Sequence, residues 1–332
     1  MLMALWSSKI LRFTIYFLVA LVASLSIASC FGKVHPWLDL LSHFTLLYLW
    51  LFLLLLLGLL FLKSYKFAAV TFALLLLSSR PVFSMYCPVV SSARNSSGEL
   101  VLGLPEVRLR ILQINPQADK NRNISGVIGY IRELQPDVLA ITELSDDWKR
   151  ALEAEFGDYP YRVIASKYSS GLALFSKLPI VDQEIVYFPG DPVEHPQIRC
   201  HLKSSAGAIK CIVAHPSVPK KMVASRNAEL LGMGEVAGKS GSPCVVLGDL
   251  NCSPWSYHFA RLLEVGKLKD SEQGFGPQPS WSTEMLIPFV PIDHFLVSND
   301  IEVLNRVLGP NLGSDHLPVY VDLLVKSSVT KP

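Results

Sequence analysis

Acidic residues are almost missing from the first 93 residues, where Asp39 is the only one against six lysines and arginines. The rest of the chain holds 24 lysines and arginines against 27 acids, so a basic segment of +5 precedes an acidic part of −3. A domain with net negative charge gains little from the phosphate-backbone attraction that dominates non-specific nucleic-acid binding. The charge balance therefore argues against a nuclease, although a local basic groove would still allow one.

Cysteine is also scarce, and the six cysteines lack the paired spacing of zinc ligands. The sequence therefore predicts no zinc site. Cys200 and Cys211 flank an apparent hairpin turn at Ser204 to Gly207, which would place them opposite each other. A disulfide in an oxidising compartment and two buried free thiols both fit this placement.

Long apolar runs fill residues 1–87, from about 10 to 30, from about 37 to 62, and from 67 onward. A membrane-spanning helix needs roughly 20 predominantly apolar residues, which the first two runs supply. The third run spans only if its helix continues through Arg80 to about Tyr86. We predict three transmembrane helices; the alternative is two spans followed by an interfacial helix.

The lysines and arginines between the runs predict the orientation. Lys9 and Arg12 precede the first run, Lys33 alone follows it, and Lys63 and Lys66 separate the second from the third. This alternation predicts a cytoplasmic N-terminus and an external first loop. With three spans, everything after residue 88 lies outside the cytoplasm, whereas with two spans it lies inside.

A signal peptide is an alternative reading of the first run. The stretch from Ile27 to Cys30 resembles the site at which bacterial lipoproteins are cleaved and lipidated on cysteine. Two further apolar runs follow at once, however, and a lipid anchor would then be redundant. We therefore favour a retained first span.

Residues 88–105, rich in Ser, Gly and Asn, predict a linker, and residues 106–326 predict a folded α/β domain with mixed sheets. The predicted strands are Val107–Ile114, Val138–Thr142, Gly171–Phe175, Ile198–Leu202, Ala208–Ala214, Cys244–Leu247, His294–Val297 and Val319–Leu324. The predicted helices are Ile124–Leu134, Asp146–Phe156, Val223–Ala237 and Tyr257–Glu264.

Polar residues recur next to these strands, where side chains can converge on a shared crevice. They are Asn115, Glu143, His215, Asp249, Asn251, Asp293, Asp315 and His316. Singly each has an ordinary explanation, since Asp and Asn are common turn formers. Together these acids, amides and imidazoles predict an oxygen-rich site for a hard cation with phosphate-binding groups around it.

Six segments then carry a resemblance to the endonuclease/exonuclease/phosphatase superfamily. They are LRILQIN (109–115), PDVLAITEL (136–144), GLALFSKLPI (171–180), VVLGDLNCSPWS (245–256), PIDHFLVS (291–298) and GSDHLPVYV (313–321). The resemblance covers roughly residues 105–325 in the family's order. It implies a four-layer αββα sandwich with two mixed β-sheets, here preceded by transmembrane helices.

The resemblance implies a metal site. Glu143 would be the principal Mg²⁺ ligand, with Asn115 and Asp315 nearby and Mn²⁺ as an alternative ion. Many relatives have Arg where this chain has Pro291, and several have an acid where it has Gln117. These two departures argue against a second metal position, and we expect a single ion.

The resemblance also implies catalytic roles. Asp249 would orient or deprotonate the attacking water, and Asn251 would hold a phosphate oxygen. His215 and His316 would stabilise charge on the phosphoryl group, while Asp293 would fix a histidine tautomer through a carboxylate hydrogen bond. This division of work suits phosphoester hydrolysis, which needs in-line water and charge neutralisation.

The chain resembles most the bacterial membrane-anchored members related to glycopeptide-resistance proteins. The His215-Pro216 pair and Arg226 are among the residues that carry this resemblance. We therefore expect the bacterial cytoplasmic membrane, an extracytoplasmic catalytic domain, and a phosphorylated lipid or lipid-linked pyrophosphate as substrate. The apolar loop from Met285 to Pro291 would dip into the membrane interface, or pack under a neighbouring loop. The alternatives are an extracytoplasmic Mg²⁺-dependent nuclease and an inactive membrane scaffold.

Overall fold

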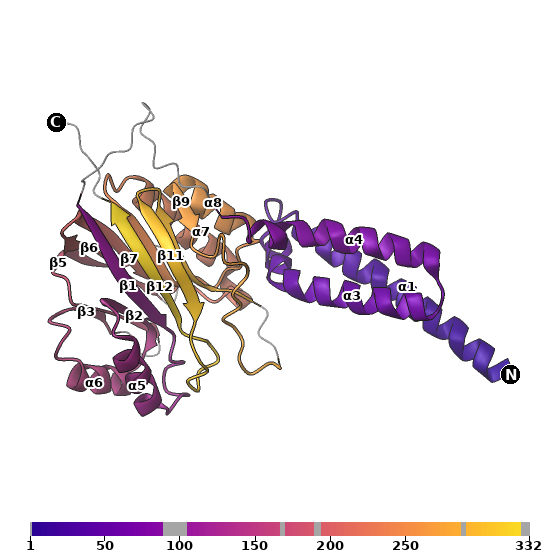
Figure 1. The fold of residues 1–332 in the computed structure, drawn as a ribbon, viewed down its shortest axis with the longest axis horizontal. Coiled ribbons are helices and arrows are strands. Elements are labelled where there is room, and N and C mark those ends of the chain that lie inside the picture. Colours follow the sequence, from indigo (N-terminus) through magenta and orange to yellow (C-terminus); the bar gives the residue numbers. More distant parts are fainter. Residues whose placement is uncertain (1, 89–104, 167–169, 189–193, 287–289, 327–332) are drawn as a thin grey trace.

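The N-terminal helices form a bundle that projects from one side of an α/β domain (Figure 1). This computed structural model describes residues 2–88, 105–166, 170–188, 194–286 and 290–326. The bundle comprises α1 (Leu2–Ser29), α2 (Pro36–Leu40), the 3₁₀ helix η1 (Leu41–Phe44), α3 (Thr45–Phe61) and α4 (Tyr65–Ser84). Residues 89–104, which make up nearly all of the predicted linker, lie outside the described part of the chain.

Three helical stretches are long and apolar enough to cross a membrane: Lys9–Ser29, Pro36–Phe61 and Tyr65–Ser84. The third, α4, runs for 20 residues through Ser79, Arg80 and Pro81 without a break. The sequence required a helix that continues through Arg80 to about Tyr86 for a third span, and α4 continues through Arg80 as far as Ser84. Buried apolar side chains pack the helices of the bundle together; Leu59, for example, shares a cluster with Val19 and Ala68.

The second apolar run begins with a short helix and a 3₁₀ turn before its regular helix. Pro36 starts α2, and the ring of His35 accepts a hydrogen bond from Trp37 N at 3.2 Å. Ser42 Oγ then donates to Asp39 O at 2.6 Å, which competes with regular helical bonding. The regular helix α3 follows only from Thr45.

The domain contains two six-stranded sheets, with the strand orders β11-β12-β1-β2-β4-β3 and β5-β6-β7-β8-β10-β9. The strands are β1 (Glu106–Ile114), β2 (Val138–Leu144), β3 (Tyr161–Ala165), β4 (Gly171–Ser176), β5 (Ile180–Tyr187), β6 (Pro196–Ser204), β7 (Gly207–Ala214), β8 (Cys244–Asp249), β9 (Leu268–Asp270), β10 (Asp293–Ser298), β11 (Ile301–Leu308) and β12 (Val319–Lys326). Only the pairs β1–β2 and β7–β8 are parallel among the described strands, so both sheets are mixed.

Helices cover the outer face of each sheet. They are α5 (Ile124–Leu134), α6 (Asp146–Glu155), α7 (Pro219–Gly238) and α8 (Tyr257–Gly266). The largest core lies between the sheets, where Ile111 and Val138 of one sheet share a buried cluster with Leu247 and Phe295 of the other. Separate cores lie under α5 and α6 and under α7 and α8. The predicted four-layer αββα sandwich is thus confirmed.

All eight predicted strands and all four predicted helices are present, with ends shifted by a few residues. Four strands were missed: β3, β5, β9 and β11. Cys200 and Cys211 are register partners in β6 and β7, as the hairpin predicted, and all six cysteines are free thiols. Between the two alternatives for this pair, the structure has the buried thiols.

Candidate active site

The carboxyl ends of the two parallel strand pairs meet at one edge of the sandwich. Asn115 follows β1, Glu143 lies near the end of β2, and His215 follows β7. Asp249 ends β8, so one parallel pair from each sheet contributes to the site. Side chains that follow the carboxyl ends of neighbouring parallel strands share one crevice, and on this basis the sequence predicted that they lie together.

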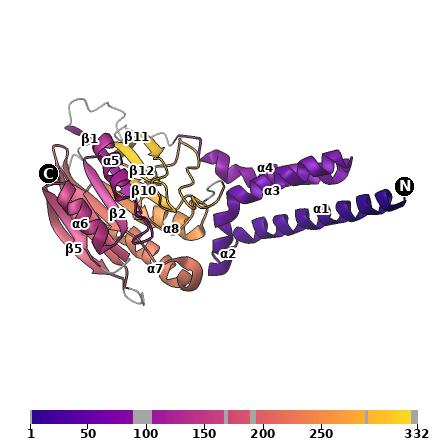
Figure 2. The same cartoon turned by 90° about the horizontal axis from the view of Figure 1, so that it is seen from below.

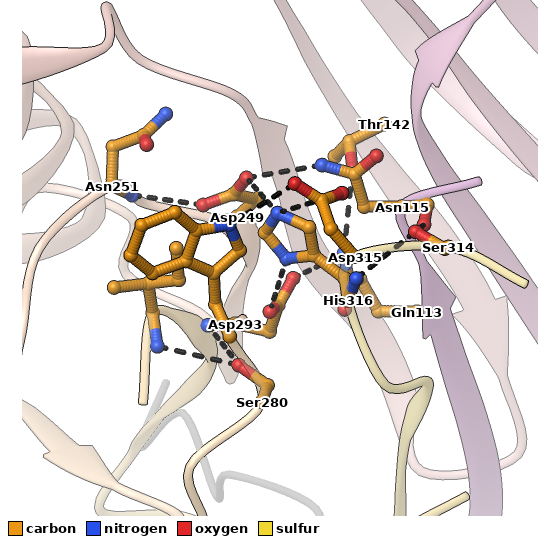
Figure 3. A network of polar contacts seen from close by, with 12 residues as sticks. Gln113, Asn115, Thr142, Asp249, Asn251, Ser280, Asp293, Ser314, Asp315 and His316 are labelled. Carbon is orange, nitrogen blue, oxygen red and sulfur yellow. Dashed lines mark hydrogen bonds and ion pairs between the residues drawn. The ribbon is translucent and has the colours of Figure 1, made fainter. Parts of the chain in front are cut away.

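The amide of Asn115 joins the two sheets. Its Nδ2 donates to Glu143 Oε1 at 3.0 Å. The same Nδ2 donates to Asp249 Oδ2 at 3.1 Å (Figure 3). Its Oδ1 accepts a hydrogen bond from Gln117 N at 2.9 Å. In this arrangement the nitrogen of Asn115 faces the carboxylates, so ligation of a metal by its oxygen requires the amide to turn; that ligand role stays a prediction.

Both predicted histidines lie against Asp249. His215 Nε2 is 3.4 Å from Asp249 Oδ2 and 3.8 Å from Glu143 Oε1. His316 Nε2 approaches the same Asp249 oxygen at 3.5 Å. Each of these histidines has only 5% of its side chain exposed, and Asp249 only 2%. A single buried carboxylate oxygen therefore faces two imidazole rings.

A chain of buried hydrogen bonds orients His316. Its Nδ1 donates to Asp293 Oδ2 at 2.8 Å, and Gln113 Nε2 donates to Asp293 Oδ1 at 3.0 Å (Figure 3). The hydroxyl of Ser280 accepts from Asp293 N at 3.3 Å. With Nδ1 engaged by Asp293, Nε2 is the ring nitrogen that faces Asp249 and the crevice. This geometry fits the tautomer-fixing role expected of Asp293.

Asn251 is fixed at three backbone or side-chain atoms. Its N–H donates to Asp249 Oδ1 at 3.0 Å, and its Nδ2 donates to Pro216 O at 3.0 Å. Its carbonyl oxygen accepts from Arg226 Nη1 at 2.7 Å. Asn251 also has a positive φ of 50°, a backbone conformation that is uncommon for residues other than glycine, although asparagine adopts it more readily than most.

Positive φ values recur at this edge, at Gln117, Ala118 and Glu143 as well as Asn251. Such strained conformations persist only where the surroundings enforce them, and they cluster at functional sites. Gly248, just before Asp249, has φ +139°. A Cβ on Gly248 would lie 1.9 Å from Ala214 O, so β7 and β8 approach too closely here for any side chain.

The charges in the crevice follow from burial and from neighbours. Burial lowers the pKa of His316, but the charges of Asp293 and Asp249 outweigh it and raise that pKa to about 10. Burial raises the pKa of Asp249, but His316 and His215 outweigh it and lower that pKa to about 2. Burial lowers the pKa of His215 too, and bonding and charge from Asp249 more than offset it, so that pKa is raised.

Asp315 lies at the rim of the same crevice. Its Oδ2 accepts a hydrogen bond from Trp281 Nε1 at 3.2 Å, and its Oδ1 is 4.0 Å from His316 Nε2. The backbone continues the link, since Asp315 O accepts from Thr283 N at 2.9 Å. Trp281 therefore fixes the orientation of Asp315, with one carboxylate oxygen left toward the histidine.

Two groups of acidic and imidazole side chains have ligand atoms within 4.8 Å of one another: Glu143, His215 and Asp249, and Asp249, Asp293 and His316. The first group suits a hard cation, because two carboxylates meet there and 26% of the Glu143 side chain stays exposed to water. Among the residues that the structure describes, Asp315 belongs to neither group.

Five residues of the site were missed as such by sequence reasoning: Gln113, Arg226 in its contact with Asn251, Ser280, Trp281 and Arg306. Arg306 is buried on β11 and donates to Asp293 O at 2.9 Å. Gln113 carried one usable signal, a polar residue within an otherwise apolar strand. Ser280 and Trp281 lie in irregular chain, where no periodicity marks a residue as inward-facing.

A model of the Endonuclease/Exonuclease/phosphatase family matches residues 101–316. Among solved structures, D. rerio TDP2 complexed with a single-strand DNA product is similar at a TM-score of 0.55 and 17% identity, covering 65% of this chain and 98% of that one.

Two bacterial proteins are similar to the same degree. An endonuclease/exonuclease/phosphatase from Bacteroides vulgatus gives a TM-score of 0.56 at 17% identity, over 66% of this chain and all of the other. One from Beutenbergia cavernae gives 0.54 at 18%, over 67% of this chain and 73% of the other. Comparison with curated proteins gave no match. At these identities the likeness to solved structures supports the fold alone.

Proposed function

The chain belongs to the endonuclease/exonuclease/phosphatase family, and from this premise we propose that it is a membrane-anchored Mg²⁺-dependent phosphoesterase acting on a phosphorylated lipid or lipid-linked pyrophosphate. Family members hydrolyse phosphodiester and phosphomonoester bonds with metal ions. The observation that carries the proposal is the junction at Asn115, which brings Glu143 and Asp249 from different sheets within reach of one ion.

The side chains in the crevice indicate which residues would bind a metal ion and what the ion would do. Glu143 and Asp249, with Asn115 beside them, would hold Mg²⁺, with Mn²⁺ as the alternative. When bound, such an ion neutralises charge on the phosphoryl oxygens and helps to orient the substrate. Asp315 is proposed as a further ligand from the rim, reached directly or through a retained water.

The protein groups around the ion would divide the remaining work. With a pKa of about 2, Asp249 is ionised at neutral pH and suits the orientation of an attacking water better than strong base catalysis. His316, protonated and held by Asp293, would stabilise charge that develops on the phosphoryl group. His215 would act from the other side of Asp249, and the amide of Asn251 would hold a phosphate oxygen.

The choice of a lipid substrate is supported by the membrane helices and by an exposed apolar loop. Leu286 is fully exposed and Met285 is 47% exposed. The loop begins beside the site, because Trp281 pairs with Val290 through two backbone hydrogen bonds of 3.0 Å and also bridges to His316. The next residues of the predicted apolar loop, 287–289, lie outside the described part of the chain. Two exposed apolar side chains close to the site suit a substrate that enters from a bilayer.

The proposed location is a bacterial cytoplasmic membrane with the catalytic domain on the outer side. It is supported by three helices of sufficient length and by the alternation of lysine and arginine between them.

A substrate panel tests the proposal. The full-length chain in phospholipid vesicles, supplied with Mg²⁺, would be assayed against a polyprenyl pyrophosphate, a phospholipid and plasmid DNA. We expect phosphate release from one of the lipids to be far faster than nicking of DNA, with EDTA abolishing it. Faster cleavage of DNA would favour a nuclease instead, and the absence of turnover on all three would favour an inactive scaffold.

A further inference from the structure

The membrane segment reaches into the catalytic domain through Asp39, the only acid in the first 93 residues. Its side chain has no exposed surface, and its carboxylate accepts from three groups of the catalytic domain. Oδ1 accepts from Tyr257 N at 2.7 Å, while Oδ2 accepts from Ser256 Oγ at 2.6 Å and Arg226 Nη2 at 3.3 Å. Figure 2 shows α2, which carries Asp39, beside α7 and α8.

Arg226 connects this carboxylate to the catalytic loop, which we define as residues 249–253. The guanidinium is fully buried and donates from Nη1 to Asn251 O at 2.7 Å, on the side opposite its contact with Asp39. Nε donates to Asn227 Oδ1 at 2.8 Å, so the fork is engaged on three sides. A planar guanidinium held in this way transmits position as well as charge.

A second contact joins the same two regions. Ser42 Oγ and Ser253 Oγ are 3.1 Å apart and both are buried. From the other side, His294 Nε2 bonds Cys252 O at 2.7 Å. The catalytic loop is therefore clamped between β10 and the membrane segment.

The loop benefits from such support because its central residue has an uncommon backbone conformation. Asn251 holds a positive φ of 50°, which persists only where neighbouring groups enforce it. Three contacts do so: the carboxylate of Asp249, the carbonyl of Pro216 and the guanidinium of Arg226. Of these, only Arg226 is itself held by the membrane segment.

We propose that Asp39 is a positioning residue: through Arg226 it holds Asn251 in place, so that the membrane segment completes the active site as well as anchoring it. The inference about activity rests on the proposed phosphoesterase function, whereas the inference about the loop does not. Removal of the Asp39 charge leaves Arg226 buried without this partner, and the catalytic loop loses its fixed contact.

The same interface supplies a matched control. Gln273, in the turn after β9, donates from Nε2 to Ser84 O at 2.5 Å and to Cys87 O at 2.6 Å. Met85 O also accepts from Gly274 N at 2.7 Å. These contacts join the end of α4 to the catalytic domain without touching the catalytic loop. Gln273→Ala therefore weakens the interface but leaves the brace intact, a name we use for the contacts from Asp39 through Arg226 to Asn251.

The test compares Asp39→Asn, Arg226→Met and Gln273→Ala in the full-length chain in detergent micelles. A soluble aryl phosphate ester with Mg²⁺ serves as substrate, so that access to a membrane does not limit the rate. We expect kcat to fall about 10- to 100-fold in the first two variants with KM little changed, since misplacement of a group by an ångström costs about that much. Gln273→Ala should retain the parental kcat.

The double variant Asp39→Asn/Arg226→Met separates positioning from stability. Replacement of both members of a buried ion pair by neutral groups removes the unpaired charge, so the melting temperature should recover towards the parental value. The kcat should not recover, because Asn251 still lacks its donor, and the two losses should not add. Recovery of kcat together with stability would show that Asp39 acts on folding alone and would overturn the proposal.

Hydrogen exchange gives a readout that needs no activity. Asp39→Asn should increase amide exchange in the peptide 249–253 and leave the strand β1 unchanged, whereas Gln273→Ala should change neither. Unchanged exchange at 249–253 would refute the brace whatever the enzyme hydrolyses. Parental protein that is inactive on every phosphoester, with exchange still increased by Asp39→Asn, would refute the proposed function and leave the brace supported.

Discussion

At the scale of single residues, the position of Asp249 depends on the glycine before it. Gly248 lies where β8 passes so close to β7 that a Cβ would meet Ala214 O at 1.9 Å, and its φ of +139° is one that side chains rarely allow. The two parallel strands can therefore bring His215 and Asp249 together only with glycine at this position. The geometry of the site therefore depends on Gly248, a residue that has no side chain to take part in the chemistry.

Gly248→Ala should accordingly destabilise the domain by about 3 kcal/mol or more, because the backbone must shift and the new residue is strained. Gly129 of α5 is the control: nothing lies within 4 Å of its would-be Cβ, and it sits inside a helix. Gly129→Ala should stabilise by about 0.5–1 kcal/mol. Thermal unfolding in detergent would measure both, and equal effects of the two changes would contradict the close-approach argument.

Glu143→Gln removes one charge from the proposed ion site and almost no volume. We expect turnover to fall by about 100-fold or more, since a preorganised charge at the reacting phosphoryl group is lost. The circular dichroism spectrum should be unchanged, because 26% of this side chain is exposed and its partner Asn115 can still bond an amide. EDTA should abolish the activity of the parent, and Mg²⁺ or Mn²⁺ should restore it. Full activity in chelator would contradict the mechanism.

His294 predicts how stability depends on pH. Burial lowers its pKa below the ordinary 6.5, so the neutral ring is the form that the folded state favours. Below pH 6.5 the unfolded chain takes up a proton that the folded chain does not, and the free energy of unfolding therefore falls as pH falls. His294→Gln, which can still donate to Cys252 O, should flatten this fall by up to about 1.4 kcal/mol per pH unit. Melting temperatures between pH 8 and 5 would check it, and parallel curves would disprove it.

Sequence reasoning named eight candidate site residues, with Asp293 as an orienting group, but it did not identify the other side chains that hold them. All eight predicted residues lie at one edge, because strand ends marked by polar residues must converge there. Gln113, Trp281 and Arg226 were missed in their orienting roles, since their partners are more than 20 residues away in the chain. Contacts of that kind follow from the packing of whole layers, which no local pattern specifies.

At the scale of elements, the four strands that the sequence missed are the four edge strands: β11 and β3 in one sheet, β5 and β9 in the other. An edge strand has one neighbour and needs no continuous apolar run. Most of β5 is exposed, and β9 is only three residues long. Central strands such as β8, buried at every position, gave the clear signal. The pattern therefore predicted the sheet interiors and left out their borders.

The second apolar run shows a different limit of the sequence pattern, because the structure divides it into α2, η1 and α3. Residues 36–44 turn into the catalytic domain, where Asp39 is buried, so the regular helix is α3 alone. Its 17 residues span about 26 Å at the usual rise, near the lower limit for crossing a bilayer. Hydropathy alone could not show that the first residues of this apolar run contact the catalytic domain.

The apolar loop next to the site makes a prediction about substrate presentation. Met285→Ser/Leu286→Ser removes the exposed apolar surface that we propose meets lipid. We expect KM for a lipid presented in a bilayer to rise about tenfold, because burial of one such side chain is worth about 1.5–3 kcal/mol. KM for a short-chain soluble analogue should change little.

Ile185→Ser is the matched control for this loop. Ile185 is 39% exposed and lies on β5, which Figure 1 places on the side of the domain away from the helices. It should leave both KM values at the parental level. Equal hydrolysis of both substrates by the loop variant would argue that the loop does not meet the membrane.

At the scale of the whole molecule, two sets of contacts fix the domain to the bundle: Asp39 with Arg226, and the end of α4 with Gln273. A domain held at two points cannot swing on a linker, even though residues 89–104 connect the two parts in sequence. These contacts hold the active-site edge in a fixed position relative to the bundle, and we propose that they set its height above the bilayer. A fixed height suits a substrate whose reactive phosphate is itself held at the membrane surface.

The same architecture makes the number of spans decisive for the compartment. Because α4 is a continuous helix of 20 residues, it is long enough for a third span, and Lys9 and Arg12 at the start favour a cytoplasmic N-terminus. Arg80 lies four residues before the end of α4 and is exposed, so its long side chain can reach the interface. A reporter that works only outside the cytoplasm should be active when fused after Pro332 or in the loop at Lys33, and inactive in the loop between α3 and α4. A cytoplasmic C-terminus would mean two spans, and substrates on the cytoplasmic side, nucleic acids included, would then replace the outer-leaflet lipid.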